Sequence, residues 1–259
     1  MDSADPSTRT FLVDTHCHVD LYPDPAGLVR DIDRRRVHTI AVTNTPTVYP
    51  RLCEIVGASR FVRVALGLHP ELAVARHREL AQFSELLTTT RYVGEVGLDY
   101  QTTVGAERLT QRRVLGTIID QCNAAGGKVV TVHSRKAAND IVDAFGEGFR
   151  GTYILHWYSG GLRALRRAVA NGAYFSMNPA MAQSDRGCAL IAEVPRDRVV
   201  TETDGPFVTV DDAPAAPHHV AIVIGALSRI WAIDEDEARQ IVYRNFSAVL
   251  KWSPRDSMR

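Results

Sequence analysis

Short apolar and β-branched segments alternate along this chain with longer segments in which apolar residues recur at helical spacing. Eight short segments are expected to be strands: 11–17, 38–43, 62–67, 92–97, 129–133, 152–156, 173–177 and 199–203. The longer segments are expected to be helices: 25–36, 47–58, 76–88, 105–125, 136–146, 161–171, 184–193, 217–231 and 235–250. Because strands that alternate with helices of this length build parallel sheets, the pattern predicts an α/β fold. Eight such units fit a closed (β/α)8 TIM barrel better than an open sheet.

Two of the expected strands are apolar or β-branched along almost their whole length, at 37–44 and 62–66. This composition is typical of parallel strands that are covered by helices outside and by packed side chains inside. No linker or low-complexity tract divides the 259 residues, so we expect one domain over 1–259, with 1–10 as a polar lead-in. A Pro- and Ala-rich loop at 209–220 follows the last strand, where a barrel borders its active site.

Composition and charge limit the possible partners. With 30 basic and 30 acidic residues the formal net charge is zero, so no global positive field attracts a long duplex. Two basic clusters are expected on solvated helix faces: Arg34, Arg35 and Arg36, and Arg163, Arg166 and Arg167. No apolar run approaches the roughly 20 residues of a membrane span, and the N-terminus lacks the basic and apolar regions of a signal peptide. We therefore expect a cytoplasmic protein without a membrane partner.

Six residues with metal-binding chemistry each stand at the end of an expected strand. They are His16, His18, Glu95, His133, His156 and Asp204. A parallel α/β barrel gathers its catalytic groups at the C-terminal ends of its strands, so these side chains should meet at one end of the barrel. A mixed set of imidazoles and carboxylates suits zinc and other divalent metal ions. The pattern predicts a metal-dependent hydrolase.

His16 and His18 form a His-x-His motif on the first expected strand. Successive strand residues point to opposite faces, so both imidazoles share one face, about 6–7 Å apart along the chain. Cys17 lies between them and should face the other way, as a small buried hydrophobe rather than a metal ligand. The other three cysteines are far apart and form no CxxC pair, which argues against a zinc ribbon or a disulfide framework.

Glu95 stands in a strand otherwise made of Val and Gly, and the small residues Gly94 and Gly97 leave room for its carboxylate. A buried carboxylate without a partner is costly, so Glu95 should bind metal or form a pair. Asp99 lies beyond the end of the strand and is expected to orient a ligand or a loop.

The later expected strands end in His133, His156 and Asp204. Taken singly, each histidine could equally be a satisfied barrel residue, and only the ordered set favours metal binding. Asp204 at a strand end can bind a metal and take a proton from its water. Glu202, two residues earlier and deeper in the barrel, is expected to form structural pairs.

Six motifs in a fixed order connect the chain with a known family. They are DTHCHVD, GLHP (67–70), GEVGLDY, VHSR (132–135), HWYSG and TETDGP. Together they resemble the TatD-type metal-dependent hydrolases of the amidohydrolase-like superfamily, from residue 12 to about 250. The resemblance implies a distorted (β/α)8 barrel with a two-metal site. It implies His16, His18, Glu95 and Asp204 as ligands of one metal ion, and Glu95, His133 and His156 as ligands of a second, so that Glu95 bridges.

The resemblance also implies an activity. A TatD-type deoxyribonuclease cleaves phosphodiester bonds of DNA, and the modest charge of this chain favours DNA with free or single-stranded ends. Zinc, magnesium and manganese all suit the implied ligands. Asp204 is the expected ligand and general base, and Glu95 is the second expected catalytic residue.

Three further residues are candidates for substrate binding: Arg135, His69 and Trp157. Arg135 could bind a phosphate with two hydrogen bonds, or it could form a salt bridge at a helix start. His69 of GLHP matches a further family position near the site. Trp157 and Tyr100 could stack on an unpaired base, although packing in the core or a loop explains each as well.

Two departures from the family pattern lie in loops. The Arg/Asn/Pro-containing segment that follows the terminal Asp in the family has no counterpart in VTVDDAPAAPHHV, and Trp157-Tyr158 is bulkier than usual. Both loops would shape substrate choice. The combination of HWYSG, FSMNPAM and TETDGPF also resembles the TatD-like subunit of Qat-type phage-defence cassettes, which implies other complex subunits as partners.

Two other functions stay open at this point. The same metal-activated water could hydrolyse an amide or an ester, but many barrel amidases bridge their metals with a carboxylated lysine. Lys128, the nearest strand lysine, precedes its strand, whereas Glu95 takes the bridging position. A scaffold subunit of a defence complex is the other alternative, and it would not need six retained ligands.

Overall fold

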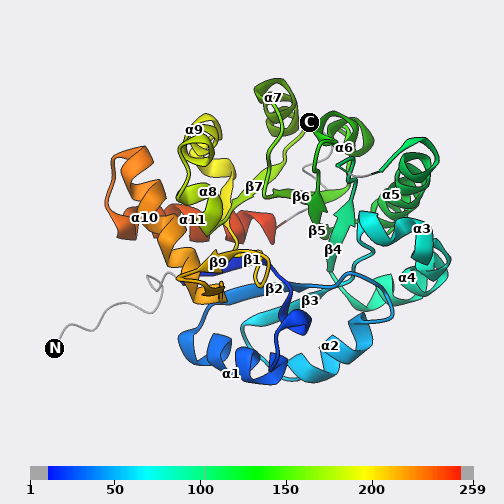
Figure 1. Cartoon of the computed structure of the whole chain (residues 1–259), viewed down its shortest axis with the longest axis horizontal. Helices are drawn as coiled ribbons and strands as arrows, with labels where there is room; N and C mark the ends of the chain where they lie inside the picture. Colours follow the sequence, from blue (N-terminus) through cyan, green and yellow to red (C-terminus); the bar gives the residue numbers. More distant parts are fainter. Residues whose placement is uncertain (1–10, 102, 252–259) are drawn as a thin grey trace.

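Eight parallel strands form an inner ring in the computed structural model, which describes residues 11–101 and 103–251 (Figure 1). The strands are β1 (Val13–Cys17), β2 (His38–Val42), β3 (Val62–Ala65), β4 (Tyr92–Gly97), β5 (Lys128–His133), β6 (Gly151–His156), β7 (Tyr174–Met177) and β8 (Val199–Thr201). All eight match expected strands, and the structure confirms the predicted (β/α)8 barrel. The polar lead-in expected at 1–10 lies outside the described residues.

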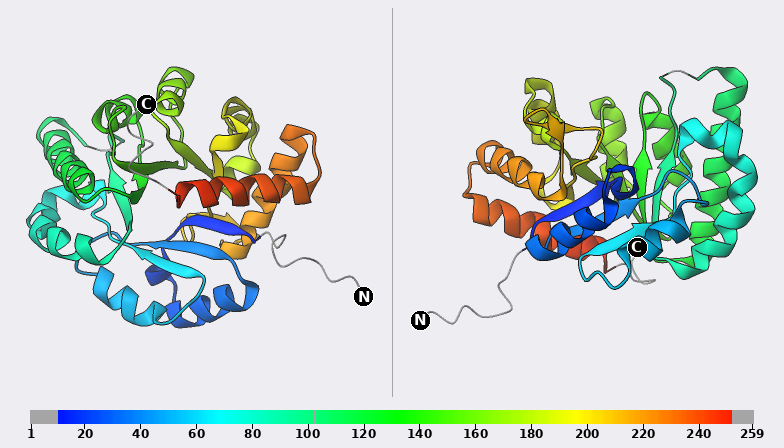
Figure 2. Two further views of the ribbon diagram at one scale, coloured as in Figure 1. Left: turned by 180° about the vertical axis from the view of Figure 1, so that it is seen from behind. Right: turned by 60° about the horizontal axis from the view of Figure 1, so that its bottom comes forward.

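Helices cover the outside of this ring (Figures 1 and 2). They are α1 (Pro25–Arg35), α2 (Tyr49–Val56), α3 (Ala73–Arg76), α4 (Leu80–Leu86), α5 (Gly105–Ala125), α6 (Ala138–Phe145), α7 (Leu162–Ala170), α8 (Pro179–Ala182), α9 (Asp185–Glu193), α10 (Val220–Trp231) and α11 (Glu235–Val249). Within the described ranges, no helix combines the length and the hydropathy that a membrane crossing requires.

Three local predictions were incomplete. The helix expected at 76–88 is divided by short 3-10 turns, including His77–Glu79, into α3 and α4. The short helix α8 was not expected. The loop expected at 209–220 contains a small antiparallel hairpin of β9 (Thr209–Val210) and β10 (Ala213–Pro214). These elements are shorter than the window over which hydrophobic periodicity can be read.

The barrel is distorted because its strands form two arcs, β1-β2-β3 and β4-β5-β6-β7-β8. Between β3 and β4 the backbone hydrogen bonds continue for one step, from Leu66 N to Tyr92 O at 3.0 Å and from Gly94 N to Leu66 O at 2.8 Å. Between β8 and β1, side-chain hydroxyl groups make the hydrogen bonds that link the two strands. The Thr15 hydroxyl donates to Thr201 O at 3.1 Å, and the Thr201 hydroxyl donates to Val13 O.

Ligand-bearing segments also close the seam between β8 and β1. Asp204 N donates to His16 O at 2.9 Å, and His18 N donates to Gly205 O at 2.8 Å. Helix α11 packs against both β8 and β1 and so covers the seam (Figure 2). Closure of the barrel therefore brings the first and the last of the predicted ligands together.

Glycines in β4 let the neighbouring strand β5 approach closely. Gly94 has φ +150°, and a Cβ there would lie 2.2 Å from Thr131 Cγ2. Gly97 has φ +148°, and a Cβ there would lie 2.1 Å from His133 O. Only glycine adopts such backbone conformations readily. These glycines make room for β5 and its His133, rather than for the carboxylate of Glu95 as expected from the sequence.

Asp14 anchors the seam from inside the barrel wall. Its Oδ1 accepts hydrogen bonds from His16 N at 3.1 Å and Thr203 N at 2.9 Å, and its Oδ2 accepts one from the Thr203 hydroxyl at 2.5 Å. Burial raises the pKa of Asp14 to about 8, while the hydrogen bonds from Thr203 and His16 act in the opposite direction.

We expect Asp14→Ala to lower the free energy of unfolding by roughly 2–3 kcal/mol, because it leaves buried donors without acceptors. Asp14→Asn keeps an acceptor for both N–H groups and should cost less than about 1 kcal/mol. Chemical denaturation of both variants measures the difference. Asp120→Ala, on the exposed face of α5, is the control. Equal stability of the two Asp14 variants would contradict this account of the seam.

Candidate active site

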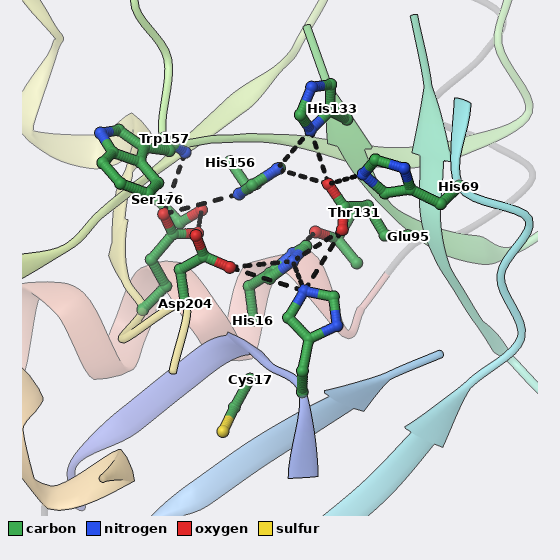
Figure 3. Close-up of polar contacts among 12 residues, drawn as sticks. His16, Cys17, His69, Glu95, Thr131, His133, His156, Trp157, Ser176 and Asp204 are labelled. Carbon is green, nitrogen blue, oxygen red and sulfur yellow. Dashed lines mark hydrogen bonds and ion pairs between the residues drawn. The ribbon is translucent and has the colours of Figure 1, made fainter. Parts of the chain in front are cut away.

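The six predicted metal ligands meet at the C-terminal end of the barrel (Figure 3). His16, Glu95, His133 and His156 belong to β1, β4, β5 and β6. His18 directly follows β1, and Asp204 lies three residues beyond the end of β8. Five of the six are almost completely buried, and His133 is partly exposed. Cys17 points away from the cluster, as expected, and its Sγ lies 3.6 Å from Gly205 O.

Glu95 occupies the centre, and its two oxygens face different histidines. Oε2 lies 3.5 Å from His16 Nε2 and 3.3 Å from His18 Nε2. Oε1 lies 2.7 Å from His133 Nδ1 and 2.8 Å from His156 Nε2. One carboxylate therefore stands between two pairs of imidazoles, which is the arrangement required of a bridging ligand.

Asp204 completes the group around Glu95 Oε2. Its Oδ1 lies 3.7 Å from His16 Nε2 and 3.5 Å from His18 Nε2. This oxygen is buried and accepts no hydrogen bond from any described residue. An unpaired buried carboxylate oxygen is costly, and a cation at this position would satisfy it.

The two ligand groups lie side by side, because the rings of His16 and His156 stack 3.9 Å apart at an interplanar angle of 11°. Ligand atoms that approach within 4.8 Å of one another occur in three triplets: His16, His18 and Glu95; His16, His156 and Asp204; and His69, Glu95 and His133. The residues can thus hold divalent cations in one continuous cluster.

The pKa values of the buried groups show that this cluster favours positive charge beside its carboxylates. Burial alone would lower the pKa of His18, but the nearby carboxylates of Asp204 and Glu95 raise it to about 9. Burial alone would raise the pKa of Glu95, yet the nearby imidazoles of His69, His156 and His133 hold it well below its usual value. The carboxylates therefore stabilise positive charge at this position, and metal ions of the predicted kind fit that charge and the donor set.

Two further side chains orient the ligands. The Thr131 hydroxyl lies 2.6 Å from His16 Nδ1, and Asp99 Oδ2 lies 2.8 Å from His133 Nε2. Each contact holds the nitrogen that faces away from the cluster, so the other nitrogen can turn a lone pair toward a metal. Asp99 was expected in such a role. Thr131 was missed, although its place two residues before His133 puts it on the same face of β5.

His69 is placed differently from the four histidines among the predicted ligands, because a backbone N–H donates to its Nδ1. Its Nδ1 accepts a hydrogen bond from Glu71 N at 3.2 Å, so in the neutral ring the proton is on Nε2. Nε2 lies 3.4 Å from Glu95 Oε1. His69 therefore faces the cluster as a hydrogen-bond donor, which suits contact with a carboxylate or a substrate oxygen better than metal ligation.

Glu202 supports the cluster from beneath, as its depth in the strand predicted. It accepts hydrogen bonds from Trp157 N at 2.9 Å, from Asn178 Nδ2 at 3.2 Å and from the Ser176 hydroxyl. Its Oε1 also lies 3.8 Å from His156 Nδ1. These contacts fix the turn after β6, where His156 and Trp157 diverge (Figure 3).

A cavity of about 580 Å³ opens over the cluster. The three residues expected to bind substrate, Arg135, His69 and Trp157, all line it. Arg135 has no carboxylate oxygen within 4.0 Å among the described residues, so a salt bridge at a helix start does not occupy it. The structure brings these three candidates to the mouth of the metal cluster.

Asn44 and Phe207 also line this cavity and were missed from the sequence. Asn44 lies two residues beyond the end of β2, and its buried Oδ1 has no hydrogen-bond partner in the described chain. Phe207 is 60% exposed and packs edge-on against the His18 ring at 5.0 Å. Trp157 is 38% exposed and lines the same cavity. The rule that located the ligands, a polar residue at a strand end, also applies to Asn44.

The chain matches the family model for TatD-related DNases over residues 13–251. Human deoxyribonuclease TATDN3 is 23% identical over 261 residues, which cover 90% of this chain and 92% of that protein. YabD of Bacillus subtilis, an uncharacterized metal-dependent hydrolase, is 28% identical over 211 residues, which cover 77% of this chain and 82% of that protein. The crystal structure of YJJV, a TatD homolog from Escherichia coli K12, superposes with a TM-score of 0.83 at 22% identity, covering 94% of this chain and 98% of that one.

Loss of the contact between Asp99 and His133 should weaken metal binding. We expect Asp99→Ala to lower metal affinity by about 10–100-fold, because the imidazole loses the partner that orients it. Asp99→Asn keeps an acceptor and should restore part of the affinity. Competition with a chromogenic chelator measures both variants, with Asp120→Ala as the control. A metal affinity of Asp99→Ala equal to that of the unmodified protein would refute this role.

Proposed function

The chain belongs to the TatD family of metal-dependent hydrolases, and from this premise we propose that it uses two divalent metal ions to cleave phosphodiester bonds of DNA. The substrate we propose is a strand with a free or single-stranded end. The observation that carries the proposal is the division of Glu95 between His16 and His18 on one side and His133 and His156 on the other.

The ligands would divide into two overlapping groups. His16, His18, Glu95 Oε2 and Asp204 would hold one metal ion, and Glu95 Oε1, His133 and His156 would hold the other. Zinc, magnesium and manganese are all compatible with these donors. When bound, two such ions supply a water that is acidic enough to react at neutral pH, and they neutralise charge on the phosphodiester.

The side chains of the cavity would perform the remaining tasks. Asp204 Oδ1, which no described group bonds, would accept the proton of the attacking water. His69 Nε2 would donate to a phosphate oxygen, and the free Arg135 guanidinium would pair with the phosphate. Trp157 and Phe207 offer exposed aromatic faces at the mouth for an unpaired base.

Hydrolysis of an amide or an ester is the alternative for the same centre. A carboxylated lysine, frequent in barrel amidases, has no support from this geometry. Lys128 lies at the start of β5, and its Nζ donates to Leu87 O at 2.7 Å and to Thr90 O at 2.5 Å. It is therefore held at the opposite end of its strand from His133, which favours a phosphodiester substrate.

The biological setting that we propose is a cytoplasmic defence system against phage, in which other subunits accompany this chain. The support is the resemblance of HWYSG, FSMNPAM and TETDGPF to a Qat-type subunit. In that setting the chain could act as an enzyme or as a scaffold, and loss of the metal ligands separates these two roles.

We expect the purified protein to carry two metal ions per chain and Glu95→Ala to lose both, because each group depends on one Glu95 oxygen. His133→Ala should keep one ion, since the group of His16 and His18 stays complete. Elemental analysis after gel filtration measures the stoichiometry, and circular dichroism verifies folding. A single ion per chain in the unmodified protein would contradict the two-metal proposal.

We expect Asp204→Asn to lower kcat on labelled single-stranded DNA by about 10²–10⁴-fold, because it removes the proton acceptor. The assay uses strands labelled at the 5′ or the 3′ end, with and without Mg²⁺, Mn²⁺ or Zn²⁺. Asp120→Asn is the matched control on the surface of α5.

Two results would contradict the proposed activity. Turnover of an amide or ester panel with intact nucleic acid would establish the alternative chemistry. Full protection against phage by cells that express Glu95→Ala or Asp204→Asn would establish a scaffold instead of an enzyme.

A further inference from the structure

We propose that a basic groove continues outward from the candidate active site and holds the phosphodiester backbone of a single nucleic-acid strand. We call it the arginine groove and define it by Arg135, Lys136, Arg163 and Arg186. The proposal rests on the proposed function, since it assigns a path to the strand whose end lies at the metal cluster.

Three hollows on the surface join into one path. The cavity over the metal cluster shares Arg135 and Ser159 with a second hollow of about 560 Å³. The second hollow shares Ala138, Asn139 and Gly161 with a third, of about 370 Å³. A ligand that leaves the metal cluster past Arg135 therefore enters a continuous depression between α6 and α7.

The charge of this path is positive. Its second and third hollows are lined by five basic side chains and two carboxylates. Both carboxylates are paired: Asp140 with Arg112 at 2.5 Å, and Asp143 with Arg167. This pairing leaves the four cations of the arginine groove, which are exposed and have no carboxylate oxygen within 4.0 Å in the described part of the chain.

The backbone around the groove adds to its affinity for anions. Helices α6 and α7 begin beside the second hollow, at Ala138 and Leu162, and their N-cap residues, Ala137 and Gly161, make no side-chain cap. Their first N–H groups are therefore free, and the helix dipoles favour negative charge there. A Cβ at Gly161 would project into open space, so the glycine at this position lets a phosphate approach the backbone.

The course of the arginine groove and the net charge of the chain indicate which ligand binds there. A protein with formal net charge zero offers no broad field for a duplex, but a narrow line of unpaired cations suits one phosphate backbone. The line begins at Arg135, inside the cavity that contains the metal ligands. Arg163 is exposed on helix α7, as expected for a solvated helix face, and there it also lines the third hollow.

The test compares the double variant Arg163→Gln/Arg186→Gln with the unmodified protein. Fluorescence anisotropy measures binding of labelled single strands, from a dinucleotide to a strand that spans all three hollows. A chelator prevents cleavage. The matched control, Arg60→Gln/Arg113→Gln, neutralises two exposed arginines without ion pairs among the described residues, before β3 and on α5.

We expect the long strand to lose affinity in the double variant and the dinucleotide to lose much less. Each neutralised phosphate contact on a single strand contributes about 0.7 to the slope of log affinity against log salt, so the slope should fall by about 1.4. An unchanged slope and length dependence, equal to those of the control, would overturn the arginine groove. Equal displacement of the strand by polyglutamate of the same length would overturn its assignment to nucleic acid.

The proposed activity and the arginine groove can be refuted independently of each other. If the metal-loaded protein hydrolyses neither DNA strands nor bis(p-nitrophenyl) phosphate, the phosphodiesterase proposal is refuted, while the binding curves still decide the groove. If the small diester is hydrolysed and the double variant binds long strands as the control does, only the groove is refuted.

Discussion

The interaction on which this structure depends is the burial of one carboxylate, Glu95, among imidazoles that contact both of its oxygens. A buried charge is tolerated only where it is paired, and here the partners come from three other strands. The wall of the barrel must therefore hold β1, β4, β5 and β6 in one register at their C-terminal ends. The close approach of β5 at Gly94 and Gly97 and the hydrogen bonds of Thr131 and Asp99 serve the same requirement.

The site divides into a rigid floor and a variable rim. The floor consists of the mostly buried candidate ligands. Thr131 and Asp99 hold the outer nitrogens of His16 and His133, and Glu202 Oε1 lies 3.8 Å from His156 Nδ1. The rim consists of exposed side chains on loops, among them Trp157 and Phe207. A floor of this kind can serve several hydrolytic reactions, since a metal-activated water attacks phosphodiesters and amides alike. The rim and the cations beyond it must therefore select the substrate.

The sequence predicted the parts of this molecule that repeat. Eight apolar segments that alternate with helical ones were sufficient for the barrel, and the family motifs contain the residues that gather at its C-terminal end. It could not predict Phe207 or the arginine groove, because these depend on which loops lie side by side after the barrel closes. Arg163 on α7 and Arg186 on α9 are separated by strand β7 and helix α8, and no periodicity relates them. Asn44 could have been predicted, because it is a polar residue near the end of a strand. It was overlooked because its side chain is uncharged.

The seam between β8 and β1 has a consequence for the life of the chain in the cell. His16 and His18 are synthesised early, yet Asp204 and the strand that holds β1 in place come almost two hundred residues later. Chains grow at about 5–20 residues per second, so an emerging chain carries an incomplete ligand group for roughly ten seconds or more. An incomplete chain on the ribosome cannot assemble the cluster around Asp204. A nuclease with this topology cannot act on the RNA of the ribosome that makes it, because its proposed metal site is incomplete until the barrel has closed.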